Sequence, residues 1–489
     1  MPNALKNRSD IRRWTQFTLG VVLALAGCSG CDSSSGAPAG AWPSDSPEAK
    51  GFDSDALADI VEKIDREEMP VDSVLLVRDG ALILDAYFYP YLGDQPHDTA
   101  SVTKSVTSTL IGIAVDQDLL SLDQPVLAFF PDLAPPTTGS DPKDAIEMRH
   151  LLTMSSGLDC GRAPAEPELY QMLGSEHFVK YALELPMAAE PGEYFAYCSP
   201  GSHLLSAMLA EAADTSTGAF AAEHLFGPLG IEEFVWPTDP QGIERGWGDL
   251  QLFPRDMARI GHLVANGGLW NGVQVVSKSW LEQATRSWIP AEVDGAGYGY
   301  QWWILAGAFD GLYEARGRGG QAIIIWPDKD IVVVFTGRGV DVRGEIALLL
   351  ADALKSDEAI EPNPAAEARL QAALAQARPP PCAGADPCIA SGRGGGLREC
   401  IPTRAEPVRY PLCVAVFRVG VGRHVRAQRR RGHVRSSGRN GRSAAFLGER
   451  PHRNARRRHG RVVVAARIRA ALRRARRAQS STHRGRLRR

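Results

Sequence analysis

Residues 101–115 read SVTKSVTSTLIGIAV, which places a serine and a lysine three positions apart at the start of an apolar run. Apolar residues recur along this run at three- and four-residue spacing: Val102, Val106, Leu110, Ile113 and Ala114. The periodicity predicts a buried helix over residues 101–119. Because positions i and i+3 share one face of a helix, Lys104 is expected to lie beside the hydroxyl of Ser101.

A hydroxyl beside a lysine amine is the arrangement of an activated serine nucleophile. The amine can take a proton only if its pKa, about 10.4 in water, is lowered. Partial burial and the positive end of a helix both lower the pKa of an amine. The helix N-terminus also offers backbone N–H groups to a developing oxyanion. The spacing alone is a weak signal, since residues 140–143 (SDPK) repeat it in a Pro/Gly/Asp-rich loop, so it makes Ser101 a candidate nucleophile and Lys104 its candidate base.

Several further segments extend this pattern in a fixed order. The ordered segments are SVTKS (101–105), HLLTMSSGL (150–158), YCS (197–199), GDLQLFPRDMARIGHLVANGG (248–268), YGYQWW (298–303) and GRGGQ (317–321). The set resembles the serine beta-lactamase-like superfamily, which includes class C beta-lactamases, D-alanyl-D-alanine carboxypeptidases and esterases. The later segments resemble in particular the branch of 6-aminohexanoate-dimer hydrolases and esterases. The resemblance covers roughly residues 55–355.

The resemblance implies an α+β fold, in which an antiparallel sheet is flanked by helices and carries an inserted, mainly helical lobe. It also implies that Ser101 forms an acyl-enzyme and that Lys104 takes the serine proton. The phenol of Tyr197 would pass protons to the leaving group, and Ser199 would hydrogen-bond in the same cluster.

A third motif is implied on a strand beside the site, and Arg318-Gly319-Gly320 is the segment that fits it. Where the family has Lys-Thr-Gly or His-x-Gly, this chain has arginine, which keeps the positive charge but cannot donate a proton at ordinary pH. Arg318 could pair with a substrate carboxylate, and the departure argues against β-lactam hydrolysis. The glycines would let a substrate approach the strand edge, or form a simple turn. The N–H of Gln321 would join that of Ser101 as an oxyanion donor.

Two of the eight cysteines, Cys160 and Cys198, lie inside the predicted catalytic region. Cys198 stands between Tyr197 and Ser199, so in an oxidising compartment a disulfide with Cys160 could hold the tyrosine in place. Two free thiols are the alternative. The histidines lack a metal-ligand spacing, so we predict no metal site, and the implied chemistry needs no cofactor.

A hydrolase domain is predicted over residues 51–360. Local patterns predict a helix at 56–68, strands at 74–77, 81–89, 298–305, 320–326 and 331–337, and a closing helix at 345–355. The early hairpin and the late strands join most economically in one sheet. The middle segment would then form a separate helical lobe, with the active site in the cleft between them.

The first 27 residues combine basic side chains with an apolar run that is too short to span a bilayer comfortably. The run ends in LAGC, which resembles the lipobox of bacterial lipoproteins. We predict a lipoprotein signal peptide over 1–27, a lipid on Cys28 and a flexible tether over 28–50. The chain would then be exported and anchored by its lipid to the cell envelope. An ordinary secretory signal is the alternative.

Charge is divided sharply along the chain. Residues 391–489 hold 29 Arg, no Lys and three Glu, a net charge of +26, whereas residues 1–390 carry 26 basic and 54 acidic side chains. Because such an acidic domain repels a phosphate backbone, no nucleic-acid partner is expected. Residues 361–489 are predicted to be a Pro/Ala linker and a disordered, Arg-rich tail, which an out-of-frame reading of GC-rich DNA would also produce. A basic arm for an anionic membrane or nucleic acid is the alternative.

These features predict a serine hydrolase that cleaves an ester or amide bond in a small molecule or short oligomer. A D-Ala-D-Ala carboxypeptidase or a beta-lactamase would use the same nucleophile, because pocket shape rather than fold decides the substrate. A non-catalytic surface protein that binds peptidoglycan or another ligand is the rival. The SVTKS and Tyr-x-Ser motifs argue against it, because a binding module needs no amine beside a nucleophile.

Overall fold

The computed structural model describes residues 42–133, 135, 141–161, 166–291, 295–339 and 343–378. The predicted signal peptide, the lipidation site Cys28 and the Arg-rich segment beyond residue 378 lie outside the described residues, so they stay predictions. Within the described residues, no helix is long and apolar enough to cross a bilayer.

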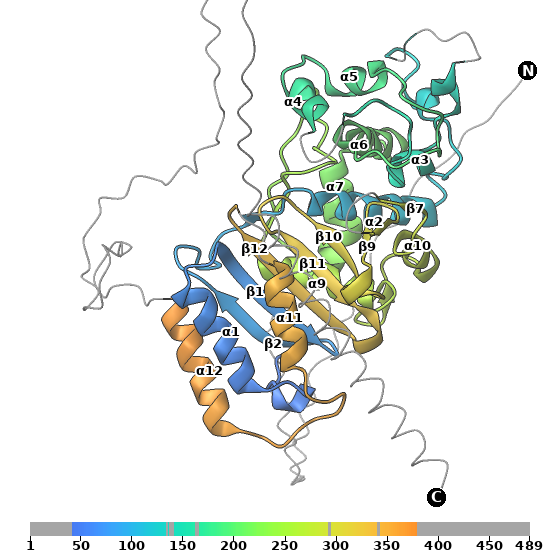
Figure 1. Ribbon diagram of the computed structural model, residues 1–489. Helices are drawn as coiled ribbons and strands as arrows, with labels where there is room; N and C mark the ends of the chain where they lie inside the picture. The colour runs from blue at the N-terminus through green and yellow to red at the C-terminus, as the bar shows by residue number, and fades with distance from the viewer. Residues whose placement is uncertain are drawn as a thin grey trace, which may run out of the picture. The chain divides into compact units, whose positions relative to one another are not determined.

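An antiparallel sheet forms the centre of the fold (Figure 1), and in the described residues it has eight strands in the order β2-β1-β12-β11-β10-β9-β8-β7. The strands are β1 (Val71–Arg78), β2 (Ala81–Tyr87), β7 (Ile289–Pro290), β8 (Gly297–Tyr298), β9 (Trp303–Ile304), β10 (Tyr313–Arg316), β11 (Ala322–Trp326) and β12 (Ile331–Gly337). β1 pairs with β12 over its whole length, from Val71 opposite Gly337 to Arg78 opposite Ile331. The predicted joining of the early hairpin to the late strands is therefore confirmed.

The sheet is buried on both faces. Alternate side chains of a strand point to opposite sides, and here the two sides belong to two different hydrophobic cores. In β1, Leu75 and Val77 belong to one hydrophobic core, and Val74 and Leu76 belong to the other. The helices α1 (Ser54–Arg66), α11 (Arg343–Ala353) and α12 (Pro364–Ala377) cover the second core (Figure 1). The first core is covered by α2 (Val102–Asp116) and α9 (Pro254–Ala265).

The segment between β2 and β7 supplies the mainly helical part of the fold, as predicted. Besides α2 and α9 it contains α3 (Met148–Leu152), α4 (Pro167–Leu173), α5 (Phe178–Glu184), α6 (Ser199–Ala213), α7 (Thr217–Ala221), α8 (Gly227–Leu229) and α10 (Lys278–Ala284). It also contains the short pairs β3 (His97–Asp98) with β4 (Gln251–Leu252), and β5 (Leu269–Trp270) with β6 (Val273–Gln274). α6 packs against α2, α3, α4 and α5, and this contact brings the Tyr-x-Ser segment to the start of α2.

The continuous strand predicted at 298–305 is wrong in its middle, where β8 and β9 form a hairpin around a turn. Gln301 has a left-handed backbone, with φ of 62°. Its N–H donates to the Leu152 carbonyl at 2.9 Å, and its side-chain oxygen accepts from the Ser202 hydroxyl at 2.8 Å. These tertiary contacts to α3 and α6 override the strand pattern of the aromatic residues.

The folded domain begins earlier than predicted. The indole of Trp42 donates to the Gly80 carbonyl at 2.8 Å, and the N–H of Leu82 donates to the Pro43 carbonyl at 2.8 Å. Residues 42–50 therefore belong to the domain, and the tether predicted to reach residue 50 is wrong for this segment. The small and polar residues of this segment did not indicate these contacts, which are made by the Trp42 indole and by the backbone of Pro43.

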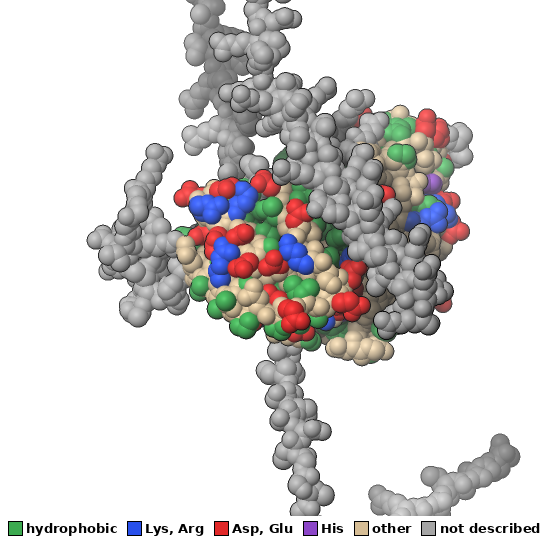
Figure 2. All heavy atoms as spheres, turned by 60° about the horizontal axis from the view of Figure 1, so that its bottom comes forward, with side chains coloured by type: hydrophobic (Ala, Val, Ile, Leu, Met, Phe, Trp, Pro, Cys, Tyr) green, Lys and Arg blue, Asp and Glu red, His purple; other side chains and the backbone are tan. Residues whose placement is uncertain are grey.

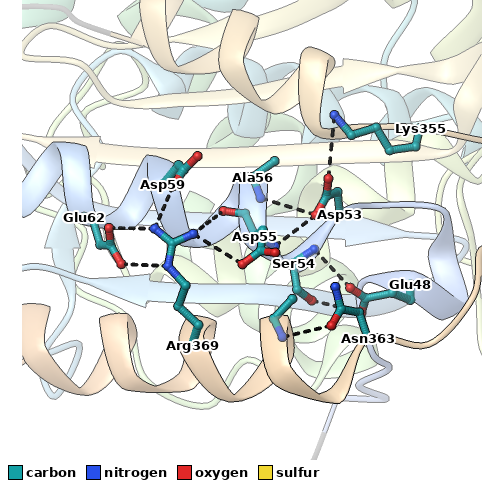
Figure 3. A network of polar contacts seen from close by, with 11 residues as sticks. Glu48, Asp53, Ser54, Asp55, Ala56, Asp59, Glu62, Lys355, Asn363 and Arg369 are labelled. Carbon is teal, nitrogen blue, oxygen red and sulfur yellow. Dashed lines mark hydrogen bonds and ion pairs between the residues drawn. The ribbon is translucent and has the colours of Figure 1, made fainter.

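The domain also ends later than the predicted boundary at residue 360. Residues 364–377 form α12, which begins with a proline at its first position, and the side chain of Asn363 accepts from the Ala366 N–H. Leu370 is 1% exposed and belongs to the core shared with α1. The guanidinium of Arg369 joins three carboxylates of α1, those of Asp55, Asp59 and Glu62 (Figure 3). A segment that composition alone marks as a linker thus completes the helical layer.

Acidic and basic side chains are interspersed on the face of the molecule that Figure 2 shows. The described part of that face therefore presents no broad region of positive charge of the kind that binds a phosphate backbone.

Buried histidines make the stability of the domain depend on pH. His262 packs between Trp42 and Trp270, and burial lowers its pKa below the ordinary value near 6.5. In the unfolded chain His262 takes up a proton below about pH 6.5, whereas in the folded chain it does so only at lower pH. The folded state therefore keeps its full stability above about pH 6.5 and loses part of it as the pH falls.

We expect His262→Phe to resist acid better than the wild type, because phenylalanine removes the proton uptake. The measurement is the melting temperature of both proteins at pH 7 and pH 5. Burial raises the pKa of Asp256 to about 6, so its proton uptake stabilises the folded state on acidification in both proteins. Comparing the two melting temperatures cancels this effect and leaves that of His262. A difference in melting temperature that stays constant between the two pH values contradicts the prediction.

Candidate active site

Ser101 follows a strained residue at the start of α2. Ala100 has φ of 47°, a left-handed conformation that costs a non-glycine residue about 1 kcal/mol. Its N–H donates to the Asp98 carboxylate at 2.8 Å, and its carbonyl accepts from the Thr103 hydroxyl at 2.6 Å. These two bonds hold the turn that carries Ser101 onto the helix N-terminus.

Lys104 is buried, with 1% of its surface exposed, and its amine meets three oxygen atoms. The Nζ atom lies 3.2 Å from Ser101 Oγ, 3.0 Å from Ser199 Oγ and 2.9 Å from the Trp247 carbonyl oxygen. The structure thus brings together the serine and lysine of the first motif with the serine of the second. The Ser199 hydroxyl in turn donates to the carboxylate of Glu166.

Tyr197 forms one wall of this cluster. The Lys104 Nζ lies 4.7 Å from the centre of its ring, and the ring also stacks on Trp303, with 5.8 Å between the ring centres. Burial raises the pKa of the neighbouring Tyr298 well above its ordinary value. Within the described part of the chain, no group hydrogen-bonds to the Tyr197 hydroxyl.

A disulfide bond joins Cys160 and Cys198, whose Cα atoms are 5.3 Å apart. Cys198 caps α6, and its sulfur accepts from the Gly201 N–H at 3.3 Å. The bond therefore ties the segment before Glu166 to the helix start that carries Ser199.

The segment assigned to the third motif lies against the turn that carries Ser101. A Cβ atom on Gly317 would come within 2.5 Å of the Thr99 carbonyl oxygen, so the two turns meet where only glycine fits. Gly319 and Gly320 have φ of 85° and 99°, which favour glycine as well. Their conformation supports the simple-turn interpretation of these residues.

Gln321 fixes this turn to the end of β12. Its side-chain oxygen accepts from the Gly337 N–H at 2.9 Å, and its side-chain nitrogen donates to the Gly337 and Arg318 carbonyls at 2.7 and 3.1 Å. The backbone N–H groups of Ser101 and Gln321 donate to no other group among the described residues. Both are free to bind an oxyanion.

Arg318 is exposed, and within the described residues it forms no ion pair. Its charge acts on Asp98, the residue that holds Ala100. Burial raises the pKa of the Asp98 carboxyl, while the Ala100 N–H and Arg318 act against this shift. In the described part of the chain, Arg318 is therefore an unpaired positive charge near the turn that carries Ser101, and the carboxylate of Glu166 is connected to Lys104 through the Ser199 hydroxyl.

Sequence reasoning missed three contributors to this site: Ala100, Glu166 and Trp247. Trp247 acts through its backbone carbonyl, which no sequence pattern reveals, although it lies beside a segment that carried the family resemblance. Glu166 precedes a proline at the start of α4, and only the packing of α4 on α6 brings its carboxylate to Ser199. In the described part of the chain, no cluster of three His, Cys, Asp or Glu residues could hold a metal ion.

Comparison with known proteins gives a family match over most of the folded domain. The sequence model of the Beta-lactamase family matches residues 57–353. The 6-aminohexanoate-dimer hydrolase of Paenarthrobacter ureafaciens is 24% identical over 305 residues, which cover 57% of this chain and 76% of that protein.

Two solved structures share the fold at low sequence identity. The hydrolase EstCE1, which has promiscuous acyltransferase activity, superimposes with a TM-score of 0.53 at 17% identity, covering 62% of this chain and 99% of EstCE1. A class C beta-lactamase superimposes with a TM-score of 0.50 at 15% identity, covering 62% of this chain and 96% of that enzyme. These likenesses bear out the predicted α+β architecture.

Proposed function

The chain belongs to the beta-lactamase family of hydrolases, and from that premise we propose that it cleaves an ester or amide bond through an acyl-enzyme on Ser101. The observation that carries this proposal is the distance of 3.2 Å between Ser101 Oγ and the buried Lys104 Nζ. A lysine amine in this position can act as a general base, because it can take the proton of the attacking hydroxyl.

The first half of the proposed reaction forms the acyl-enzyme. Ser101 Oγ bonds to the substrate carbonyl carbon, and its proton passes to Lys104 Nζ. The carbonyl electrons move onto the oxygen, where the Ser101 and Gln321 N–H groups stabilise the negative charge. When the carbonyl re-forms, the leaving group departs with the proton that Lys104 took from Ser101. Tyr197, whose ring lies beside Nζ, would pass this proton on through its hydroxyl, which bonds to no other described group. Water then attacks the ester and releases the acid by the reverse proton path.

The proposed substrate is a short ester or amide that carries a carboxylate. Exposed Arg318 supports this proposal, because its guanidinium is free to pair with such a group. The Paenarthrobacter relative is named for hydrolysis of the 6-aminohexanoate dimer, a short amide. The arginine also replaces the proton-donating residue of the family's third motif, so β-lactams should be poor substrates.

A substrate panel tests this proposal. We expect mono-p-nitrophenyl esters of short dicarboxylic acids, which keep one free carboxylate, to be hydrolysed with a kcat/KM at least about 100-fold above that for nitrocefin, which corresponds to about 2.7 kcal/mol of transition-state stabilisation. The 6-aminohexanoate dimer and D-Ala-D-Ala peptides serve as the amide arms, read by release of free amine. Absence of cleavage of every ester and amide in the panel contradicts the proposal.

We also propose that the chain is exported and held at the cell envelope by a lipid on Cys28. The disulfide between Cys160 and Cys198 supports export, because such bonds persist in oxidising compartments.

A further inference from the structure

Glu166 is the carboxylate that touches the proposed catalytic cluster. It lies directly before α4 with φ of 39°, a conformation that non-glycine residues seldom adopt. Its Oε2 atom accepts the hydrogen bond of the Ser199 hydroxyl, and Ser199 Oγ lies 3.0 Å from Lys104 Nζ. Glu166 is therefore connected to the proposed base through a single hydroxyl.

The directions of these hydrogen bonds follow from what each group can donate. A carboxylate only accepts, so the one hydrogen of the Ser199 hydroxyl is used by Glu166. Ser199 must then accept from Lys104, and the Trp247 carbonyl, 2.9 Å from Nζ, can only accept as well. A neutral amine has two N–H bonds and one lone pair. With both N–H bonds used, the lone pair of Lys104 is left for Ser101.

Without the carboxylate this direction is not fixed. A serine hydroxyl rotates and serves as either donor or acceptor. The Ser199 hydroxyl could then donate to the lone pair of Lys104 and compete with the proton of Ser101. The amine would remain in place but would lose its capacity to act as a base.

We propose that Glu166 is a positioning residue, which fixes the direction of the Ser199 hydroxyl and so keeps the lone pair of Lys104 available to Ser101. This inference rests on the proposed function, in which Ser101 is the nucleophile and Lys104 is its base.

Other charged and titratable groups of the site come from every side of Lys104. Tyr197, Tyr298 and Arg316 lie around the ring of Trp303. Asp98, Asp249 and Arg318 interact near the turn that carries Ser101. The His203–Asp239 pair packs against the ring of Trp247. These groups are the same in all the variants below. A change in labelling rate between variant and wild type therefore isolates the residue that was replaced.

The test is the rate of covalent labelling by a fluorophosphonate, followed by intact mass between pH 5 and pH 10. In this reaction the Ser101 oxygen bonds to phosphorus, the P–F bond breaks, fluoride leaves, and the serine proton passes to Lys104. For Glu166→Gln we expect labelling about 10- to 100-fold slower, because the amide can donate to Ser199 as well as accept from it, so the direction of the Ser199 hydroxyl is no longer fixed. A purely structural role for Glu166 would slow labelling by the same factor with and without the Ser199 hydroxyl, which the double-mutant cycle below measures.

Glu168→Gln is the matched control. It removes the same charge from α4, but Glu168 bonds to Tyr181 and Gln171 rather than to the cluster. Its labelling profile should match that of the wild type.

A double-mutant cycle with Ser199→Ala completes the test. Adding Glu166→Gln to Ser199→Ala should slow labelling no further, because the hydroxyl through which Glu166 acts is absent. Labelling of Glu166→Gln at the wild-type rate overturns the inference, and so does an equal further loss in the Ser199→Ala background. Failure of the proposed function looks different, because the wild type itself would then take no label on Ser101.

Discussion

Replacing Ser101 by alanine is expected to lower the hydrolysis rate of the best ester substrate by about 10⁴-fold or more. The variant lacks the atom that would bond to the substrate carbonyl, and the remaining oxyanion donors and binding contacts support only residual catalysis. The measurement is the initial rate of p-nitrophenyl ester hydrolysis at matched protein concentration.

Ser108→Ala is the control for this prediction. Ser108 lies on the same helix, is buried, and its hydroxyl has no hydrogen-bond partner in the described residues. Its removal should leave the hydrolysis rate and the melting temperature nearly unchanged. Full activity of Ser101→Ala would show that another group performs the chemistry.

Leu370→Ala should destabilise the domain by about 2–5 kcal/mol, the usual cost of a cavity left by a buried leucine. Leu370 is 1% exposed in the core that joins α12 to α1 and to the sheet. The measurement is the free energy of unfolding in urea, which compares the variant with the wild type. This loss of stability would come from a substitution in α12, a segment that the sequence composition assigned to a linker.

Arg369→Ala is the neighbouring control. Arg369 contacts Asp55, Asp59 and Glu62, but its side chain is 38% exposed, and exposed ion pairs contribute little to stability. Its effect should be a small fraction of that of Leu370→Ala. A second comparison uses chains that end at residue 360 or 378, which differ only by the segment that contains α12. Equal stability of these two chains would contradict the packing described here.

The sheet was largely predictable because its strands have strong local signals. β12 (Ile331–Gly337) matches its predicted bounds, and the Asp79-Gly80 turn joins β1 to β2 as the sequence indicated. The strand around Gln301 was not predictable, because distant carbonyls on α3 hold that turn. Residues 364–377 were missed for a related reason, since an alanine-rich segment becomes a stable helix here by packing on α1.

The candidate site was predictable where chemistry depends on residue type and spacing. Ser101 and Lys104 are one helical turn apart, and family resemblance added Tyr197 and Ser199. Sequence could not indicate Glu166, because its role depends on how α4 packs against α6. Sequence assigned Arg318-Gly319-Gly320 to a strand beside the site, whereas these residues form the turn between β10 and β11. The hydrogen bonds of the Gln321 side chain could not be predicted, because the end of β12 lies next to Gln321 only in the folded sheet.

The central claim is that Ser101 is a nucleophile and that Lys104 activates it. Mass-spectrometric mapping of the fluorophosphonate adduct, on the wild type and on Lys104→Met, tests this claim most directly. We predict one label per chain on the Ser101 peptide of the wild type, and labelling of Lys104→Met slowed by about 10³-fold. No adduct on Ser101, an adduct on another residue, or equal labelling of the two proteins would contradict the claim.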